Sequence, residues 1–434
     1  MPAAILNDQS GDQSGNGIVR LTNCRLIKDA GIVSEDLWFS SITGKILHGQ
    51  DVFYQRQGAP EQTLDLGGKL IAPGFIDVQV NGAFGFDFSA VPDDMATYHK
   101  GLHKVNHDFL RTGVTSYLPT ITSQVPEVFQ QALPYLAPSG TSRNASLGCE
   151  SLGAHCEGPF ISHAKSGAHN HSMLRSAFNG FKDLEACYGT ENLSSPSPPI
   201  RLITLAPELP GILDAITELK KRGIVVSMGH SEASCATGGE ALARGASMIT
   251  HLFNAMPAPV AREPSLFGLL ASSSASSTQN PPRKQTRPYF GLVADNIHLH
   301  PNTLSLAYHA HPAGCILVTD SSWPLGLPDK TYPWTNGDSL VKNGSRLTLG
   351  GTDKLAGSCT TLIDCVNNLW LGTGIELSKA MATVTSAPAE MLGLQGIKGC
   401  LAHGADADLV VLDDTNGRLE VDGVWKFGVK AWQG

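Results

Sequence analysis

Four side chains have the chemistry that a metal-dependent hydrolase needs, and each of them ends a short apolar run. Glu157, His230 and His251 offer one carboxylate and two imidazoles, a ligand set of catalytic zinc that leaves a fourth position for water. A metal held in this way lowers the pKa of its water from about 16 towards about 7 and polarises a carbonyl. Asp320 is the free carboxylate that can take up and pass on the proton of that water.

Each of these residues also has an ordinary structural role open to it. A histidine at the end of a strand is often a satisfied structural residue, and Glu157 before Gly-Pro can cap a turn. Asp320 before two serines can cap the N-terminus of a helix. Because all four residues end apolar runs, we predict that they converge at one site.

The stretch PGFIDVQVNG, residues 73–82, places polar residues where a buried strand should be apolar. Asp77, Gln79 and Asn81 alternate with apolar residues, and alternate side chains of a strand point to the same face. We therefore expect all three polar side chains to face the interior, on the side that bears the site.

Repeated units of a short apolar run followed by a helix-like segment extend over residues 73–398. Such units predict a parallel sheet, and about seven or eight of them favour a (β/α)₈, TIM-like barrel, in which functional residues lie at the C-terminal ends of the strands. A doubly wound open sheet is the alternative.

The two ends of the chain carry short strands without helix-length periodicity. We expect residues 18–72 and 399–434 to form one small β-sandwich domain into which the barrel is inserted. Residues 1–17 are expected to be a flexible tail, and the segment 271–288, rich in Ser, Pro and basic residues, a mobile insertion.

The overall composition favours a globular cytoplasmic protein. The 434 residues are 41% apolar and carry a formal net charge of −8, which argues against nucleic acid or an anionic membrane as the partner. Nine cysteines without a C-x-x-C pair indicate a reducing compartment. We find neither a signal peptide nor an apolar stretch long enough for a membrane span.

The motifs PGFIDVQVNG, HCEGPF, GHS, HLFNAM, ADNIH, VTD, LAGS and DADLVVLD occur in this order along the chain. This ordered set resembles the N-acetylglucosamine-6-phosphate deacetylases, a family of the amidohydrolase superfamily, over nearly the whole chain from about residue 18. The resemblance implies a TIM-like barrel with a β-sandwich built from both chain ends, and a homodimer. It also implies hydrolysis of N-acetyl-D-glucosamine 6-phosphate to D-glucosamine 6-phosphate and acetate.

The resemblance also implies roles for individual residues. Glu157, His230 and His251 would hold the metal, and Asp320 would act first as base and then as acid. Eight more residues would contact the substrate: His298 the sugar and developing oxyanion, Arg262 the phosphate, and Asn254, Ala255, Ala168, Leu355, Ala356 and Gly357 the acetamide and sugar. Arg262 can also be a surface loop charge, and Ala168 and the LAGS residues can be ordinary loop packing.

Relatives in the superfamily end their first barrel strand with His-x-His, which binds a second metal. Here those positions are Gln79 and Asn81, and neutral amides are poor zinc ligands beside imidazole. We therefore predict one divalent metal ion per subunit, with zinc as the first candidate. Iron, cobalt and manganese accept similar ligands.

Two rival functions are considered. A cyclic-amide hydrolase of the same superfamily commonly uses a bridging carboxylated lysine, but no lysine ends any of the apolar runs. A non-catalytic sugar-phosphate sensor has no need of a general base, so the presence of Asp320 with the three metal ligands disfavours it.

Overall fold

Eight of the predicted apolar runs form a parallel barrel in the computed structural model, which describes residues 15–54, 59–194, 196–271, 287–334 and 337–434. Residues 1–14 of the expected tail and 272–286 of the expected insertion lie outside the described residues. Neighbouring strands pair in chain order: β8 (Phe75–Val80), β11 (Val114–Ile121), β13 (Ala154–Glu157), β14 (Ile200–Leu205), β15 (Val225–Met228), β16 (Met248–Ile249), β17 (Tyr289–Leu292) and β18 (Cys315–Leu317).

The barrel is nearly closed between its last and first strands. Ser321 forms a parallel bridge with Val80, and the Asp320 amide donates to the Gln79 carbonyl at 2.9 Å. Residues 383–384 also join the two strands, because they accept hydrogen bonds from the amides of Leu317 and Ile76. The TIM-like barrel is confirmed, and the open doubly wound sheet is wrong.

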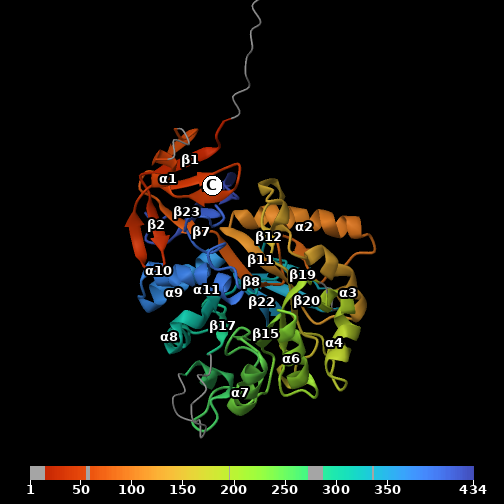
Figure 1. The fold of residues 1–434 in the computed structure, drawn as a ribbon. Helices are drawn as coiled ribbons and strands as arrows, with labels where there is room; N and C mark the ends of the chain where they lie inside the picture. The colour runs from red at the N-terminus through yellow and green to blue at the C-terminus, as the bar shows by residue number, and fades with distance from the viewer. Residues whose placement is uncertain (1–14, 55–58, 195, 272–286, 335–336) are drawn as a thin grey trace, which may run out of the picture.

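Helices surround the barrel on its outside (Figure 1). In α2 (Met95–Leu110), Asp94 caps the N-terminus by accepting from the Ala96 amide, and Tyr98, Leu102 and Phe109 are buried on one face. The other helices around the barrel are α3 (Pro126–Ala132), α4 (Phe181–Tyr188), α5 (Thr190–Ser194), α6 (Ile212–Lys221), α7 (Cys235–Arg244), α8 (Pro301–Ala310), α9 (Leu362–Thr373), α10 (Leu377–Ala382) and α11 (Ser386–Met391), whereas α1 (Gly49–Tyr54) lies beside the strands of the N-terminal segment.

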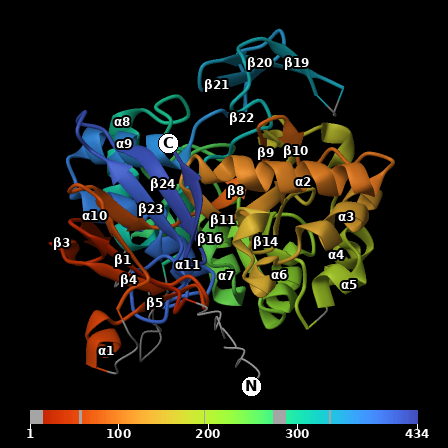
Figure 2. The same cartoon turned by 90° about the horizontal axis from the view of Figure 1, so that it is seen from above.

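Both chain ends build the small β domain, as expected. One sheet has the order β5-β4-β1-β6, and the other has the order β25-β24-β23-β7-β2-β3, in which strands of the two chain ends lie side by side (Figure 2). The strands are β1 (Ile18–Thr22), β2 (Arg25–Lys28), β3 (Gly31–Ser34), β4 (Leu37–Ser40), β5 (Lys45–Leu47), β6 (Gln62–Asp65), β7 (Leu70–Pro73), β23 (Leu409–Asp413), β24 (Glu420–Lys426) and β25 (Val429–Gln433). The domain limits at 72/73 and 398/399 stay predictions.

A buried cluster of charges joins the β domain to the barrel. Lys426 of β24 donates to Glu150 of β12 (Glu150–Ser151) at 2.6 Å and to Asp408 at 2.7 Å. Lys398 reaches Asp408 at 3.0 Å and Asp406 at 2.8 Å. Because the Lys426 side chain is fully buried, these carboxylates are the partners that compensate for its removal from water.

Two small antiparallel sheets that the sequence did not predict border the barrel. The first is the hairpin of β9 (Gly82–Ala83) and β10 (Phe86–Asp87), directly after β8. The second follows β18 and consists of β19 (Thr331–Pro333), β20 (Ser339–Asn343), β21 (Arg346–Leu349) and β22 (Leu355–Ser358). We call this second sheet the cap; Figure 2 shows it standing beyond one end of the barrel.

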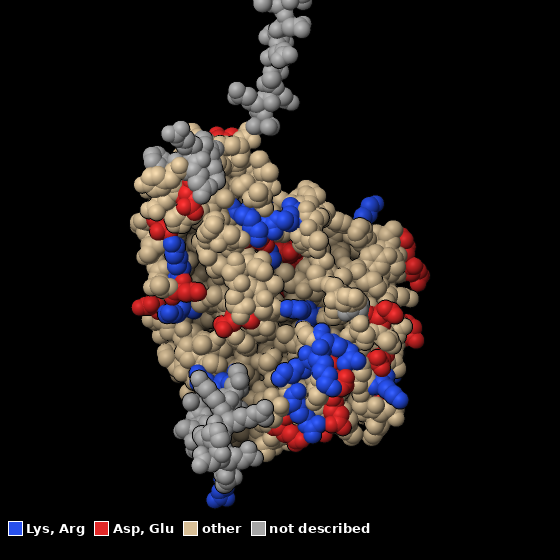
Figure 3. Space-filling model, in the orientation of Figure 1, with Lys and Arg blue, Asp and Glu red and all other residues tan. Residues whose placement is uncertain are grey.

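The surface of the face seen in Figure 3 carries basic and acidic side chains near one another. Ion pairs join Lys221 to Glu218 at 2.6 Å, and Arg244 to Asp214 at 2.6 Å. The absence of a nucleic-acid partner stays a prediction. No helix in the described part of the chain is long and apolar enough to cross a membrane.

Candidate metal centre and active site

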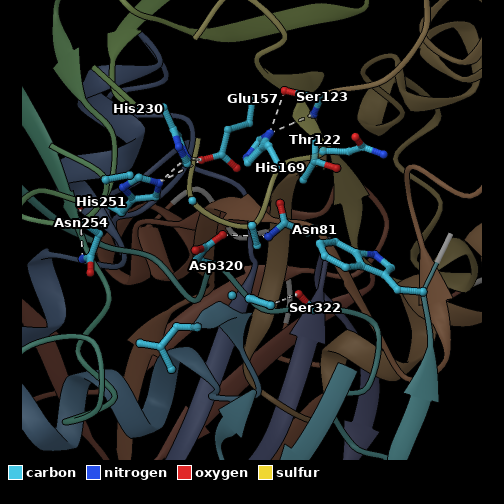
Figure 4. Close-up of a pocket in the computed structure, with 18 of the residues that line it drawn as sticks. Asn81, Thr122, Ser123, Glu157, His169, His230, His251, Asn254, Asp320 and Ser322 are labelled. Carbon is cyan, nitrogen blue, oxygen red and sulfur yellow. Dashed lines mark hydrogen bonds and ion pairs between the residues drawn. The ribbon is translucent and has the colours of Figure 1, made fainter. Parts of the chain in front are cut away.

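Glu157, His230, His251 and Asp320 lie together in one pocket at the C-terminal ends of the barrel strands (Figure 4). Glu157 is the last residue of β13, and the other three follow β15, β16 and β18 within a few residues. The Glu157 Oε1 atom lies 3.2 Å from His230 Nε2 and 3.0 Å from His251 Nε2. The convergence predicted from the sequence is therefore present.

Three of these residues have a backbone conformation that side chains rarely adopt. The φ angles are +49° at His230, +27° at His251 and +46° at Asp320. Non-glycine residues at positive φ are costly and persist where surrounding contacts hold them, often at functional sites. The chain thus turns sharply at the strand ends, at the residues that direct their side chains into the pocket.

The hydrogen bonds of His230 show that the three ligand atoms suit a cation. His230 Nδ1 lies 2.8 Å from the Lys165 carbonyl and donates to it, so Nε2 is the ring atom left to take up a proton or a metal ion. That Nε2 lies 3.0 Å from His251 Nε2 and also faces the Glu157 carboxylate. Lone pairs that meet in this way repel unless protons or a metal ion stand between them.

Electrostatics at Glu157 support the same conclusion. Burial acts to raise the pKa of Glu157, but the hydrogen bonds with His230 and His251 outweigh it and hold that pKa well below the ordinary value. The carboxylate is therefore ionised, and a buried negative charge is stable only with a positive charge beside it. A divalent cation with two imidazoles and one carboxylate meets this need.

His169 is a pocket residue that sequence reasoning missed. It lies beside Glu157 and His230, with ligand atoms of all three within 4.8 Å of one another. Its Nδ1 accepts from the Ser123 amide at 3.2 Å, which places the proton of the neutral ring on Nε2. Burial lowers the pKa of His169 to about 3, with the charge of His230 as the next cause. His169 is thus a neutral hydrogen-bond donor. Its position directly after the predicted Ala168 was the available signal in the sequence.

A second group of acidic residues, Glu150, Asp406 and Asp408, also brings three carboxylates within 4.8 Å. The ammonium groups of Lys398 and Lys426 already lie among these carboxylates. This cluster is therefore a set of ion pairs and not a metal site.

Amide side chains of the first strand hold Asp320. Asn81 Nδ2 donates to Asp320 Oδ1 at 2.7 Å, while Gln79 Nε2 donates to Glu157 Oε1 at 2.9 Å and to Asp320 Oδ1 at 3.3 Å. Both amides thus present N–H donors to the carboxylates. Burial and the nearby charge of Glu157 raise the pKa of Asp320 to about 6.

The predicted substrate residues divide into two groups. Seven of them line the pocket: Ala168, Asn254, Ala255, His298, Leu355, Ala356 and Gly357. The last three belong to β22, so the cap forms part of the pocket wall. His298 is oriented by Asp295, whose Oδ2 lies 2.7 Å from His298 Nδ1.

Arg262 is the exception. It is exposed on the loop that follows His251, and it is absent from the pocket wall. Among the described residues, neither lysine nor arginine lines the pocket. The structure therefore does not bring Arg262 together with the other predicted residues.

Comparison with known proteins shows the family to which the chain belongs. Residues 70–430 match the model of the amidohydrolase family. The chain belongs to the amidohydrolase family. It is 39% identical over 423 residues to N-acetylglucosamine-6-phosphate deacetylase of Mus musculus, an alignment covering 97% of both chains. It is 38% identical to the enzyme of the same name from Homo sapiens, over 98% of both.

The amidohydrolase fold agrees with that of solved structures. The crystal structure of N-acetylglucosamine-6-phosphate deacetylase from Pasteurella multocida superposes with a TM-score of 0.79 and 24% sequence identity, covering 96% of this chain and 100% of that one. At this identity the likeness concerns the fold. The resemblance expected from the ordered motifs is confirmed.

A further carboxylate in this amidohydrolase holds the turn that follows His230. Glu208 accepts from the Ser231 hydroxyl and from the Glu232 amide, both at 2.6 Å. We expect Glu208→Gln to weaken this turn, because an amide offers one acceptor oxygen in place of two. The affinity for a divalent metal ion should fall about tenfold, since groups that orient metal ligands typically have effects of this size.

The affinity is measured by competition with a chromogenic chelator, with Glu240→Gln, an exposed carboxylate of α7, as control. A lowered melting temperature with unchanged metal affinity would show that Glu208 supports only the fold.

Proposed function

We propose that the chain hydrolyses N-acetyl-D-glucosamine 6-phosphate to D-glucosamine 6-phosphate and acetate, in the breakdown or recycling of amino sugars. The observation that carries the proposal is the convergence of Glu157, His230 and His251 with Asp320 in one pocket. Identity of 38–39% over almost the full length to enzymes with this name supports the choice of substrate.

One divalent metal ion per subunit, with zinc as first candidate, would be held by Glu157, His230 and His251. When bound, it would lower the pKa of a water molecule and polarise the acetyl carbonyl. A second cation is disfavoured because Gln79 and Asn81 turn their N–H groups towards the two carboxylates.

Asp320 then carries the proton through the reaction. It takes a proton as the water oxygen bonds to the acetyl carbon, and it returns that proton to the nitrogen as the C–N bond breaks. The products are the free amine and acetate. His169 and His298 line the same pocket as donors, suited to the acetyl oxygen and to the sugar.

The phosphate needs a positive partner that the described pocket wall lacks. We propose Arg262 for this role, since its guanidinium can bind two phosphate oxygens at once. Its exposed position requires that the loop folds over the pocket or that a second subunit brings the arginine in, which agrees with the proposed homodimer.

Arg262→Ala tests this role. We expect the KM for N-acetylglucosamine 6-phosphate to rise at least about tenfold, the loss of one charged hydrogen bond, while the KM for unphosphorylated N-acetylglucosamine stays within about twofold. Arg418→Ala, at an arginine half exposed on the β-domain side, is the control. Equal effects on both substrates would remove Arg262 from the phosphate site.

Acetate release from N-acetylglucosamine 6-phosphate, with metal content measured on the same sample, tests the proposed function. Absence of acetate from metal-replete protein would favour a sugar-phosphate sensor, and two tightly bound ions per chain would contradict the single-metal proposal. A cyclic-amide hydrolase with a carboxylated lysine is disfavoured because no lysine lines the described pocket. We place the enzyme in the cytoplasm, where the nine free cysteines stay reduced.

A further inference from the structure

One wall of the pocket contains neither the proposed metal ligands nor the proposed base. Figure 4 shows Thr122 and Ser123 on one side of Glu157 and Asp320, and His251 and Asn254 on the other. Asp87 of β10 also lines the pocket and belongs to the Thr122 side, because it is linked to Thr122 through Ser89. We call the side formed by Asp87, Thr122 and Ser123 the β10 wall.

Hydrogen bonds hold the Asp87 carboxylate in place. Its Oδ1 accepts from the Ser89 amide at 2.8 Å, and Ser89 Oγ accepts from the Thr122 amide at 3.1 Å. The Trp334 indole of the cap also hydrogen-bonds to Asp87. Asp87 and Trp334 thus meet from two separate sheets, and both line the pocket.

The charge of the β10 wall selects what can lie against it. Burial raises the pKa of Asp87 to about 6, which leaves the group ionised at neutral pH. The proposed metal ion would offset the negative charges of Glu157 and Asp320. Asp87 has no such partner, because neither lysine nor arginine lines the described pocket wall. A phosphate dianion is repelled here, and neutral hydroxyl groups are attracted.

The pair also has the chemistry of a sugar contact. An ionised carboxylate accepts strong, charge-assisted hydrogen bonds from hydroxyl groups. An indole offers a flat apolar surface together with a polar N–H, which suits the C–H face of a pyranose ring. Trp323, whose ring contacts Tyr332 of the cap at a centroid distance of 4.9 Å, adds a second aromatic side chain to the lining.

We propose that Asp87 and Trp334 form a subsite for the sugar hydroxyl groups, with Asp87 as hydrogen-bond acceptor and Trp334 against the ring. This subsite rests on the proposed function and sets the direction of the substrate. The hydroxyl groups face the β10 wall, and the phosphate points away from Asp87, towards the side of His251 and the loop that bears Arg262.

Asp87→Asn separates the possible roles when two substrates are compared. The amide oxygen of asparagine still accepts from the Ser89 amide, but the charge is lost. We expect kcat/KM to fall about tenfold or more, and by the same factor, for N-acetylglucosamine 6-phosphate and for N-acetylglucosamine. Asp93→Asn, an exposed carboxylate in the same connection, should leave both values unchanged.

Two outcomes would overturn the subsite. A gain for the phosphorylated substrate alone would mean that Asp87 faces the phosphate, and unchanged values for both would mean that Asp87 does not contact the sugar. If Asp87→Asn fails to fold, Trp334→Phe serves instead, because it keeps an aromatic ring and removes the indole N–H. A parallel loss with both substrates supports the subsite, and no loss with either contradicts it.

Calorimetry of D-glucosamine 6-phosphate binding tests the subsite independently of the proposed reaction. If the wild-type chain releases no acetate yet binds this sugar phosphate, and Asp87→Asn weakens that binding about tenfold, the subsite stands and the proposed reaction fails. If the wild-type chain does not bind it, the subsite fails as well.

Discussion

Asp320→Asn should lower kcat by about 10²–10⁴-fold, because it removes the group that we propose moves the proton. Asparagine has nearly the same shape, and its amide can stay beside Asn81 and Gln79, so the fold should persist. Metal content should also persist, since the proposed ligands are Glu157, His230 and His251.

The measurement is steady-state acetate release by metal-replete protein, with metal content determined on the same sample. Asp353→Asn, at an exposed carboxylate of the cap, is the matched control and should behave as wild type. A kcat close to wild type would refute Asp320 as the base. Loss of the metal together with activity would instead make Asp320 a ligand.

The pH dependence of kcat is a second test of Asp320 as the base. The base must be ionised, so kcat falls as the pH drops through the pKa of Asp320. Burial and the charge of Glu157 raise this pKa to about 6, and a bound cation would lower it again. We therefore expect the acidic limb of kcat at about pH 6 or below. The residual activity of the asparagine variant should lack that limb.

Lys426→Met should lower the free energy of unfolding by about 3–5 kcal/mol, the range found when one partner of a buried ion pair is removed. Methionine fills similar space but leaves Glu150 and Asp408 without the ammonium that lies 2.6 and 2.7 Å from them. The lost ion pairs lie at the junction of the β domain and the barrel, so we expect the contact between these two parts to weaken.

Urea denaturation at neutral pH measures the change, and Lys104→Met is the control. Lys104 forms an exposed pair with Asp108 on α2, and such pairs contribute at most about 1 kcal/mol. A loss of less than about 1 kcal/mol in Lys426→Met would show that Lys398 compensates alone.

The pH dependence of stability provides a second check on the cluster. Burial acts to raise the pKa of Asp408, but Lys398 and Lys426 outweigh it and hold that pKa well below the ordinary value. A carboxyl with a depressed pKa in the folded state stabilises the protein above its unfolded pKa of about 4. Wild-type stability should fall as the pH drops below that value.

The sequence by itself determined the barrel and the four residues that end its strands. Strand and helix periodicities arise from neighbouring residues, so Glu157, His230, His251 and Asp320 could be placed at strand ends, and parallel strands bring those ends together. The same alternation placed Gln79 and Asn81 on the inner face, where both contact Asp320.

Only the tertiary structure decided which loop residues reach the pocket. His169 is brought to Glu157 by a loop without any periodic pattern, and Trp334 meets Asp87 through a cap sheet far along the chain. Arg262, which the motif order assigned to the phosphate, is exposed outside the described pocket wall. The physical reason is that loop paths depend on contacts between distant segments, whereas strands and helices carry their pattern in adjacent residues.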